Sequence, residues 1–364
     1  MPESLPERLL LGPGPSNAAP EVRAALAQPL IGHLDPAFLE VLDRVQRNLA
    51  TLFRCRNGLT IPLSATGSAG MEACLVNLLE PGDVALIGVA GVFGSRMAEV
   101  ARRCGARTVC VEVEMGQTIP PERMADAIRA ERPSLVALVH AETSTGVAQP
   151  IAEVAREARS AGALMLADCV TSLSGMDVRL DDWGVDAAYS GTQKCLGCPP
   201  GLSPLALGPR AIERLNKRSR PVQSWYLDLG LIGDYFGQSR VYHHTAPVSM
   251  IFALDCALQR VLDEGLEARF ERHREAHLRL VDGLEELGFE MLVPEGRRLP
   301  MLNTVVPPVP DEAALRRLLL DRHDIEVGGG LGSLAGRVWR IGLMGENARP
   351  EIVDRLLAAL RQLL

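Results

Sequence analysis

Short apolar segments alternate with segments of helical spacing through the first half of the chain. In residues 68–79 the apolar side chains recur on one face of a helix. Apolar runs with the length of strands follow at 84–89, 108–113, 135–139, 163–167 and 185–189. Strands that are apolar throughout are buried on both faces of a sheet. The pattern therefore predicts an α/β fold, with a mostly parallel sheet covered by helices on both faces.

The chain of 364 residues is long enough for two domains. Residues 1–15, which are rich in turn formers, are predicted to be an N-terminal arm. Residues 16–246 hold the strand–helix units and are predicted to form the large domain. Residues 247–364 begin with long helical patterns and continue with short strands, which predicts a smaller C-terminal α+β domain.

Charge and hydropathy exclude several classes of protein. The net charge is −7 and the densest basic patch is residues 216–220, which argues against nucleic acid as a partner. No apolar run reaches the length of about 18 residues that a membrane span needs. Residues 1–7 lack the basic and apolar regions of a signal peptide, which predicts a cytoplasmic protein. The eight cysteines are predicted to be reduced and mostly buried.

Three other patterns suggest a binding site only weakly. Cys195 and Cys198 have the spacing of a metal-binding pair, but no second pair follows, so no metal is expected. His273 and His277 lie four residues apart in a charged helical pattern, and we expect them to face solvent. Residues 328–332 resemble a dinucleotide-binding turn but open no strand–helix–strand unit, which predicts a mobile loop.

A lysine and an aspartate follow two of the predicted strands. Asp168 ends the run at 163–167, and Lys194 lies between small residues beyond the run at 185–189. Ligands of open parallel sheets lie beyond the carboxyl ends of the strands, so both side chains should face one site. A lysine amine forms an imine with an aldehyde, and an aspartate keeps a pyridine nitrogen protonated. The pair predicts pyridoxal 5′-phosphate as cofactor.

Two further segments fit such a cofactor. Thr66, Gly67 and Ser68 open the helix at 68–79, where free N–H groups and the helix dipole favour an anion such as a phosphate. Helix capping by the side chain of Thr66 or Ser68 is the alternative. Phe93 stands between glycines after a strand and could stack on a flat ring. The alternative is a phenylalanine that plugs the core.

Arg340 lies inside an apolar strand pattern, where an arginine needs a partner. Its guanidinium could bind the carboxylate of a substrate with two hydrogen bonds. A buried structural ion pair is the alternative.

Several short motifs are combined along nearly the whole chain. They are residues 11–16 (LGPGPS), 66–73 (TGSAGMEA), 140–146 (HAETSTG), 190–194 (SGTQK) with 199–201 (PPG), 242–245 (YHHT) and 340–343 (RIGL). On these motifs and on Asp168 the chain resembles the class V, fold-type I, pyridoxal-phosphate aminotransferases, and in particular their alanine–glyoxylate and serine–pyruvate branch. The resemblance implies a large domain with a seven-stranded, mostly parallel sheet and a smaller C-terminal domain.

The resemblance also implies a role for each matching residue. Lys194 would form the imine with the cofactor and shuttle the proton, and Asp168 would pair with the ring nitrogen. The other cofactor contacts it implies are Thr66, Gly67, Ser68 and Gln193 around the phosphate, Phe93 and Val170 against the ring, Thr143 near the ring oxygen, and Tyr242 and Thr245 toward the phosphate of a partner subunit. Arg340 and Gly14 would bind the substrate. Ser68 stands where some relatives have histidine, and Phe93 where tryptophan is frequent.

The implied activity is a ping-pong transamination in a homodimer with shared sites. A small 2-amino acid, alanine or serine, would donate its amino group to glyoxylate or pyruvate. A lyase of the cysteine desulfurase type is an alternative, but it needs a reactive cysteine on a mobile loop, and Cys256 lies in a helical pattern. The sequence is also compatible with a phosphoserine aminotransferase and with a non-catalytic regulator that binds pyridoxal phosphate.

Overall fold

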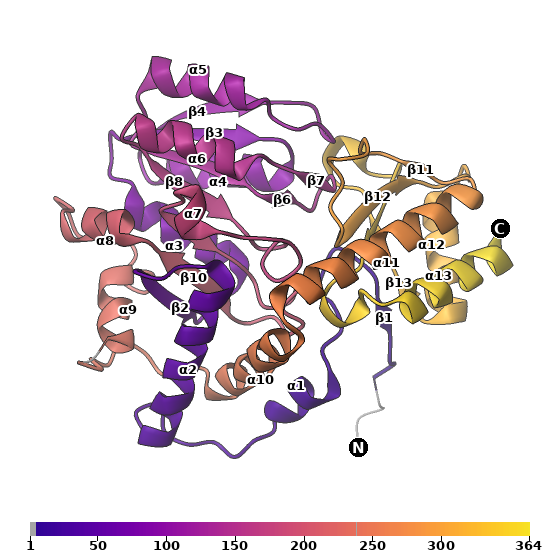
Figure 1. The fold of residues 1–364 in the computed structure, drawn as a ribbon, viewed down its shortest axis with the longest axis horizontal. Helices are drawn as coiled ribbons and strands as arrows, with labels where there is room; N and C mark the ends of the chain where they lie inside the picture. Colours follow the sequence, from indigo (N-terminus) through magenta and orange to yellow (C-terminus); the bar gives the residue numbers. More distant parts are fainter. Residues whose placement is uncertain (1–4, 238) are drawn as a thin grey trace.

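A seven-stranded sheet forms the centre of the larger part of the molecule (Figure 1). The computed structural model describes residues 5–237 and 239–364. The strands lie in the order β2 (Leu59–Leu63), β10 (Ser203–Leu207), β9 (Ala187–Tyr189), β8 (Leu164–Asp168), β5 (Leu135–Val139), β3 (Val84–Val89) and β4 (Arg107–Glu112). Only β10 runs antiparallel to its neighbours in this sheet. The predicted α/β class with a mostly parallel sheet is confirmed.

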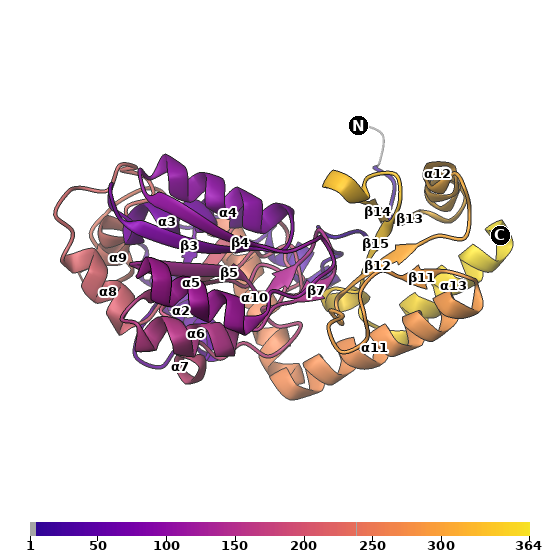
Figure 2. The same cartoon turned by 90° about the horizontal axis from the view of Figure 1, so that it is seen from above.

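Helices cover both faces of this sheet (Figure 2). One face is covered by α3 (Gly67–Leu78), α4 (Val92–Arg103) and α8 (Pro209–Asn216). On the other face lie α5 (Pro121–Glu131), α6 (Ile151–Ser160) and the short α7 (Leu180–Trp183). Helix α2 (Pro36–Phe53) packs near β2 and β10, and α10 (Val248–Glu264) packs on α2. Helix α1 (Pro20–Ala25) lies beside α10, and α9 (Leu229–Phe236) lies beside α8 and β2. Because helices cover both faces, the strands of the sheet are almost entirely buried, apart from the edge strand β4.

The smaller part is an antiparallel sheet with three helices. Its strands lie in the order β11 (Glu290–Met291), β12 (Leu302–Val306), β15 (Trp339–Gly342) and β14 (Gly328–Gly329). The helices are α11 (Leu266–Glu286), α12 (Glu312–His323) and α13 (Pro350–Leu363). Their apolar faces build a separate hydrophobic cluster around Trp339, as an α+β arrangement requires.

The division into domains can be compared with the two main hydrophobic clusters. The larger cluster extends from Ala19 through α10 to Val261, so this helix packs with the large part although it lies beyond the predicted boundary at residue 247. The smaller cluster takes in Leu9 and Leu11 from the N-terminal segment. That segment forms β1 (Leu9–Leu10), which pairs in parallel with β13 (Ile325–Glu326).

Two expectations from the sequence are wrong. His273 and His277 do not face solvent, since 0% and 8% of their surface is exposed. His273 Nδ1 donates to Arg269 O at 2.8 Å, and Gly345 N donates to His273 Nε2 at 3.1 Å. These partners satisfy the ring inside the protein, which hydropathy alone does not reveal.

The glycine-rich segment at 328–332, which the sequence predicted to be a loop, is not a loop throughout. Its first two residues form β14, which pairs with β15 opposite Arg340 and Trp339. It continues into a 3₁₀ turn, Gly332–Leu334.

Within the residues that the structure describes, no helix is long and apolar enough to cross a membrane, and no cluster of His, Cys, Asp and Glu could hold a metal ion. All eight cysteines are free thiols.

The N-terminal segment is held against β15 by a close backbone contact. Gly342 N donates to Leu11 O at 2.8 Å, and a Cβ at Gly342 would lie 2.1 Å from Gly12 O. We expect Gly342→Ala to lower the free energy of unfolding by about 1–3 kcal/mol, because backbone atoms cannot move aside as a side chain can. Gly32→Ala is the control, since its new Cβ would lie 3.9 Å from its nearest neighbour. Equal thermal unfolding midpoints for the two variants would contradict this.

Candidate active site

The N-terminus of α3 presents backbone N–H groups at the edge of the large sheet. Thr66 is the N-cap residue, and its carbonyl accepts hydrogen bonds from Ala69 N (2.9 Å) and Gly70 N (3.2 Å). Its side chain makes no capping hydrogen bond, so the capping alternative is not found. The N–H groups of the first turn of a helix have no partner within the helix, and the helix dipole adds positive potential. This end of α3 can therefore bind an anion.

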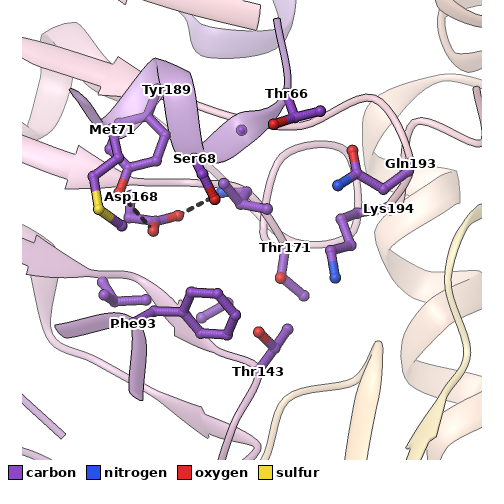
Figure 3. A pocket seen from close by; sticks show the side chains of 14 residues that line it. Thr66, Ser68, Met71, Phe93, Thr143, Asp168, Thr171, Tyr189, Gln193 and Lys194 are labelled. Carbon is purple, nitrogen blue, oxygen red and sulfur yellow. Dashed lines mark hydrogen bonds between the residues drawn. The ribbon is translucent and has the colours of Figure 1, made fainter. Parts of the chain in front are cut away.

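Asp168 ends β8 at the same edge. One carboxylate oxygen, Oδ1, accepts from Val170 N at 2.9 Å, and the other, Oδ2, accepts from Tyr189 Oη at 2.7 Å (Figure 3). Burial raises the pKa of Asp168 to about 6, while the two hydrogen bonds act in the opposite direction. The carboxylate is thus negative at neutral pH in a nearly dry environment, where it would stabilise a cationic partner strongly.

Lys194 follows β9 and points into the same pocket (Figure 3). Its Nζ donates to the carbonyl oxygen of Pro13 in the N-terminal segment. Burial lowers the pKa of Lys194 to about 8, which leaves an appreciable fraction of the amine neutral near neutral pH. Gly14 borders the amine so closely that a Cβ there would lie 2.5 Å from Nζ. A lysine in this state can act as a nucleophile or as a base.

A buried carboxylate and a hydroxyl hold the start of α4, which carries Phe93. Glu142 Oε2 accepts from Gly94 N at 3.3 Å, and Ser144 Oγ accepts from Val92 N at 3.0 Å. Ser144 Oγ in turn donates to Glu142 Oε1 at 2.5 Å. Burial raises the pKa of Glu142, against these hydrogen bonds. The contacts hold the main chain on either side of Phe93, whose half-buried ring lines the pocket and also packs against the large hydrophobic cluster.

Arg340 approaches the pocket from β15 of the small part. Its Nε donates to Gly329 O at 2.8 Å, and its Nη1 donates to Thr143 O at 3.2 Å. No carboxylate of the described residues lies within salt-bridge distance of it, so the alternative of a structural ion pair is not found. Two main-chain carbonyls orient the guanidinium, and neither neutralises its charge.

The pocket brings together most of the residues that the sequence singled out. Those that line it are Thr66, Gly67, Ser68, Phe93, Thr143, Asp168, Val170, Gln193 and Lys194. Gly14 and Arg340 contact this group through Lys194 and Thr143. Tyr242 and Thr245 are exposed on the surface and do not line the pocket of their own chain. Their roles, like the others, stay predictions.

Sequence reasoning missed five residues that line the pocket, namely Met71, Val139, Ala141, Thr171 and Tyr189. Tyr189 could have been found, because it ends the predicted strand at 185–189 as Asp168 ends the neighbouring one. The other four carry no chemical signal of their own.

The pattern of the family described as "Aminotransferase class-V" matches residues 24–354. Alanine–glyoxylate aminotransferase of Drosophila melanogaster is 40% identical, over 99% of this chain and 93% of its own length. (S)-ureidoglycine–glyoxylate transaminase of Bacillus subtilis is 35% identical, over 99% of this chain and 91% of its own. The crystal structure of alanine–glyoxylate aminotransferase from Nostoc sp. superposes with a TM-score of 0.98 at 49% identity, over 100% of this chain and 97% of that one.

The Ser144 hydroxyl is the link between Glu142 and the start of α4. We expect Ser144→Ala to destabilise the protein by about 1–3 kcal/mol, because it removes one donor from a buried carboxylate and the acceptor of Val92 N. Amide hydrogen exchange at residues 92–94 should become faster. Ser95→Ala is the control, since Ser95 is exposed and donates to the main chain of its own helix. Unchanged exchange at 92–94 in Ser144→Ala would contradict the anchoring role.

Proposed function

The chain belongs to the class-V aminotransferase family, and we propose that it transfers the amino group of alanine or serine to glyoxylate or pyruvate with pyridoxal 5′-phosphate as cofactor. The observation that carries the proposal is one pocket that combines Lys194, Asp168 and the N-terminus of α3. The names of the similar proteins support the substrates, since two of them act on alanine and glyoxylate.

The residues of the pocket fit this cofactor. The free N–H groups at Gly67 and Ser68 suit its phosphate. Gln193 supports this, because its side-chain amide points into the pocket, where the NH2 group can donate to a phosphate oxygen (Figure 3). Phe93 and Val170 offer surfaces for the ring. Bound there, pyridoxal phosphate supplies an aldehyde that reacts with amines and a ring that accepts electrons.

Lys194 would have two tasks in the reaction. Its amine would hold the cofactor covalently between turnovers and give way to the amino group of the substrate. The released amine would then carry a proton between the Cα of the substrate and the C4′ atom of the cofactor. The lowered pKa of Lys194 keeps the amine available as a base for this transfer. Asp168 would meanwhile keep the ring nitrogen protonated, which increases the ability of the ring to accept electrons.

Arg340 would bind the α-carboxylate of the substrate. The hydrogen bonds to Gly329 O and Thr143 O use Nε and one hydrogen of Nη1, which leaves further donors for a carboxylate. The only charged side chains that line the pocket in the described chain are Asp168 and Lys194. Arg96 lies outside this lining and donates to Ser68 Oγ at 3.2 Å. The lining therefore offers no dedicated cation for a second substrate carboxylate, which favours small substrates such as alanine and serine.

A lyase of the cysteine desulfurase type has less support. It would need a thiolate that reaches the substrate from a mobile loop. Cys256 lies within α10, and burial raises the pKa of its thiol, so the reactive thiolate is disfavoured.

We also propose that two chains share their active sites in a homodimer. Tyr242, which is 57% exposed, and Thr245 lie on a surface segment with other exposed apolar side chains, Val241 and Trp225. An exposed apolar patch of this kind is typical of an interface.

The sharing of sites can be tested with two inactive variants. Lys194→Ala and Tyr242→Ala should each lower the activity of the pure protein. Mixed dimers of the two should regain activity, because one of their two sites keeps Lys194 from one chain and Tyr242 from the other. The mass in solution should be that of two chains. A monomer with wild-type activity, or mixed dimers without recovery, would contradict the proposal.

Lys194 and Lys217 are the only lysines of the chain, which allows a clean test of the covalent attachment. After borohydride reduction with pyridoxal phosphate at low concentration, mass spectrometry should find the label on Lys194. Lys194→Ala should lose this label and fall by several orders of magnitude in alanine–glyoxylate transamination. Lys217→Arg should keep both, since Lys217 is exposed and pairs with Glu213. Full activity of Lys194→Ala would overturn the proposed function.

A further inference from the structure

We propose that Tyr189 is a positioning residue that, through its hydrogen bond to Asp168, keeps that carboxylate ionised and oriented toward the ring nitrogen of the cofactor. The inference rests on the proposed function and deepens it, because it assigns the proton balance of the ring to a residue outside the predicted set.

The register of the sheet brings the two side chains together. β8 and β9 pair in parallel, and Asp168 and Tyr189 are partners at the last residue of each strand. Neighbouring residues of paired strands place their side chains on the same face of a sheet. Tyr189 is completely buried, and its hydroxyl donates to Asp168 Oδ2 at 2.7 Å. The contact is thus built into the strand pairing and does not depend on a loop.

Each oxygen of the carboxylate has one donor. Val170 N occupies Oδ1, and Tyr189 Oη occupies Oδ2. An ionised carboxylate has about four acceptor positions, so acceptor capacity remains on both oxygens for a ring N–H. With both oxygens held, the carboxylate cannot rotate without breaking a buried hydrogen bond. The pair of donors therefore sets the direction in which the free lone pairs point.

Burial and a neighbouring carboxyl work against the charge of Asp168, whereas Val170 N and Lys194 favour it, as Tyr189 does. Glu142 of β6 (Ala141–Glu142) adds a second buried carboxyl, and the thiols of Cys74 on α3 and Cys169 are the other titratable neighbours. Lys194 is the cation on this side. Burial raises the pKa of Asp168, and the hydrogen bond from Tyr189 opposes this most strongly. The pKa of Tyr189 itself is raised, first by burial, so its hydroxyl stays a donor.

The role proposed for Tyr189 concerns the position of the proton shared by Asp168 and the ring nitrogen of the cofactor. When the cofactor is bound, the proton between Asp168 and the ring nitrogen can belong to either. A hydrogen bond from Tyr189 stabilises the carboxylate, and so favours the proton on the nitrogen. Its loss should shift this equilibrium toward the neutral carboxyl by about tenfold or more, which is the weight of a hydrogen bond to a charged group.

The test compares Tyr189→Phe with the wild type, both reconstituted with pyridoxal phosphate labelled with ¹⁵N in the ring. Phenylalanine keeps the ring and its packing and removes only the hydroxyl. The ¹⁵N chemical shift should move from the value of a protonated toward that of an unprotonated pyridine, and kcat for alanine should fall about tenfold or more. Tyr235→Phe is the matched control, since Tyr235 is also buried and its hydroxyl donates to His33 O at 2.8 Å, outside the pocket.

A cofactor analogue with carbon in place of the ring nitrogen completes the experiment. With this analogue the difference in kcat between wild type and Tyr189→Phe should vanish, because no proton is left to place. An unchanged ¹⁵N shift, or an equal loss of kcat with both cofactors, would overturn the inference. If the wild type itself neither binds pyridoxal phosphate nor converts alanine, the proposed function fails instead, and the two failures are thereby distinguished.

Discussion

The parallel pairing of β8 with β9 is the constraint on which the site depends. It places Asp168 and Tyr189 side by side. Because the segment that carries Lys194 leaves the end of β9, Lys194 lies at the same edge of the sheet. The pairing is stable because helices bury both faces of these strands. A shift of register by one residue would turn Asp168 to the opposite face of the sheet, away from α3. Hydrophobic packing thus fixes the geometry of the polar groups.

Burial then determines how these polar groups behave. The same dry environment lowers the pKa of Lys194, raises that of Asp168 and raises that of Glu142. Burial therefore disfavours the charged form of each group, and different hydrogen bonds compensate for this in each case. Asp168 accepts two hydrogen bonds, from Val170 N and Tyr189 Oη. Glu142 accepts from Gly94 N in the first turn of α4, and Lys194 donates to Pro13 O. A lysine held partly neutral beside a carboxylate held ionised is an arrangement that suits proton transfer.

Much of the fold could be predicted from the sequence, and the reasons are local. The apolar strands and the helix that begins at Gly67 are visible in short windows, so Asp168 and Lys194 could be placed at strand ends. The buried His273 could not, because its polar partners come from Arg269 and from the distant Gly345. Tyr189 could likewise be placed at a strand end, but its contact with Asp168 could not be predicted, since strand order and register are decided by tertiary packing.

The small sheet contributes Arg340, the cation proposed to bind the α-carboxylate of the substrate. Arg340 is fixed by β14 and by Thr143, so its position depends on a strand, Gly328–Gly329, whose sequence predicted a loop. Carbonyl groups orient the guanidinium through dipoles, which leaves its full positive charge for a ligand. Had a carboxylate of the chain held it, the substrate would have to displace that carboxylate at a large cost. An arginine held by main-chain carbonyls is therefore ready to bind a substrate carboxylate before the substrate arrives.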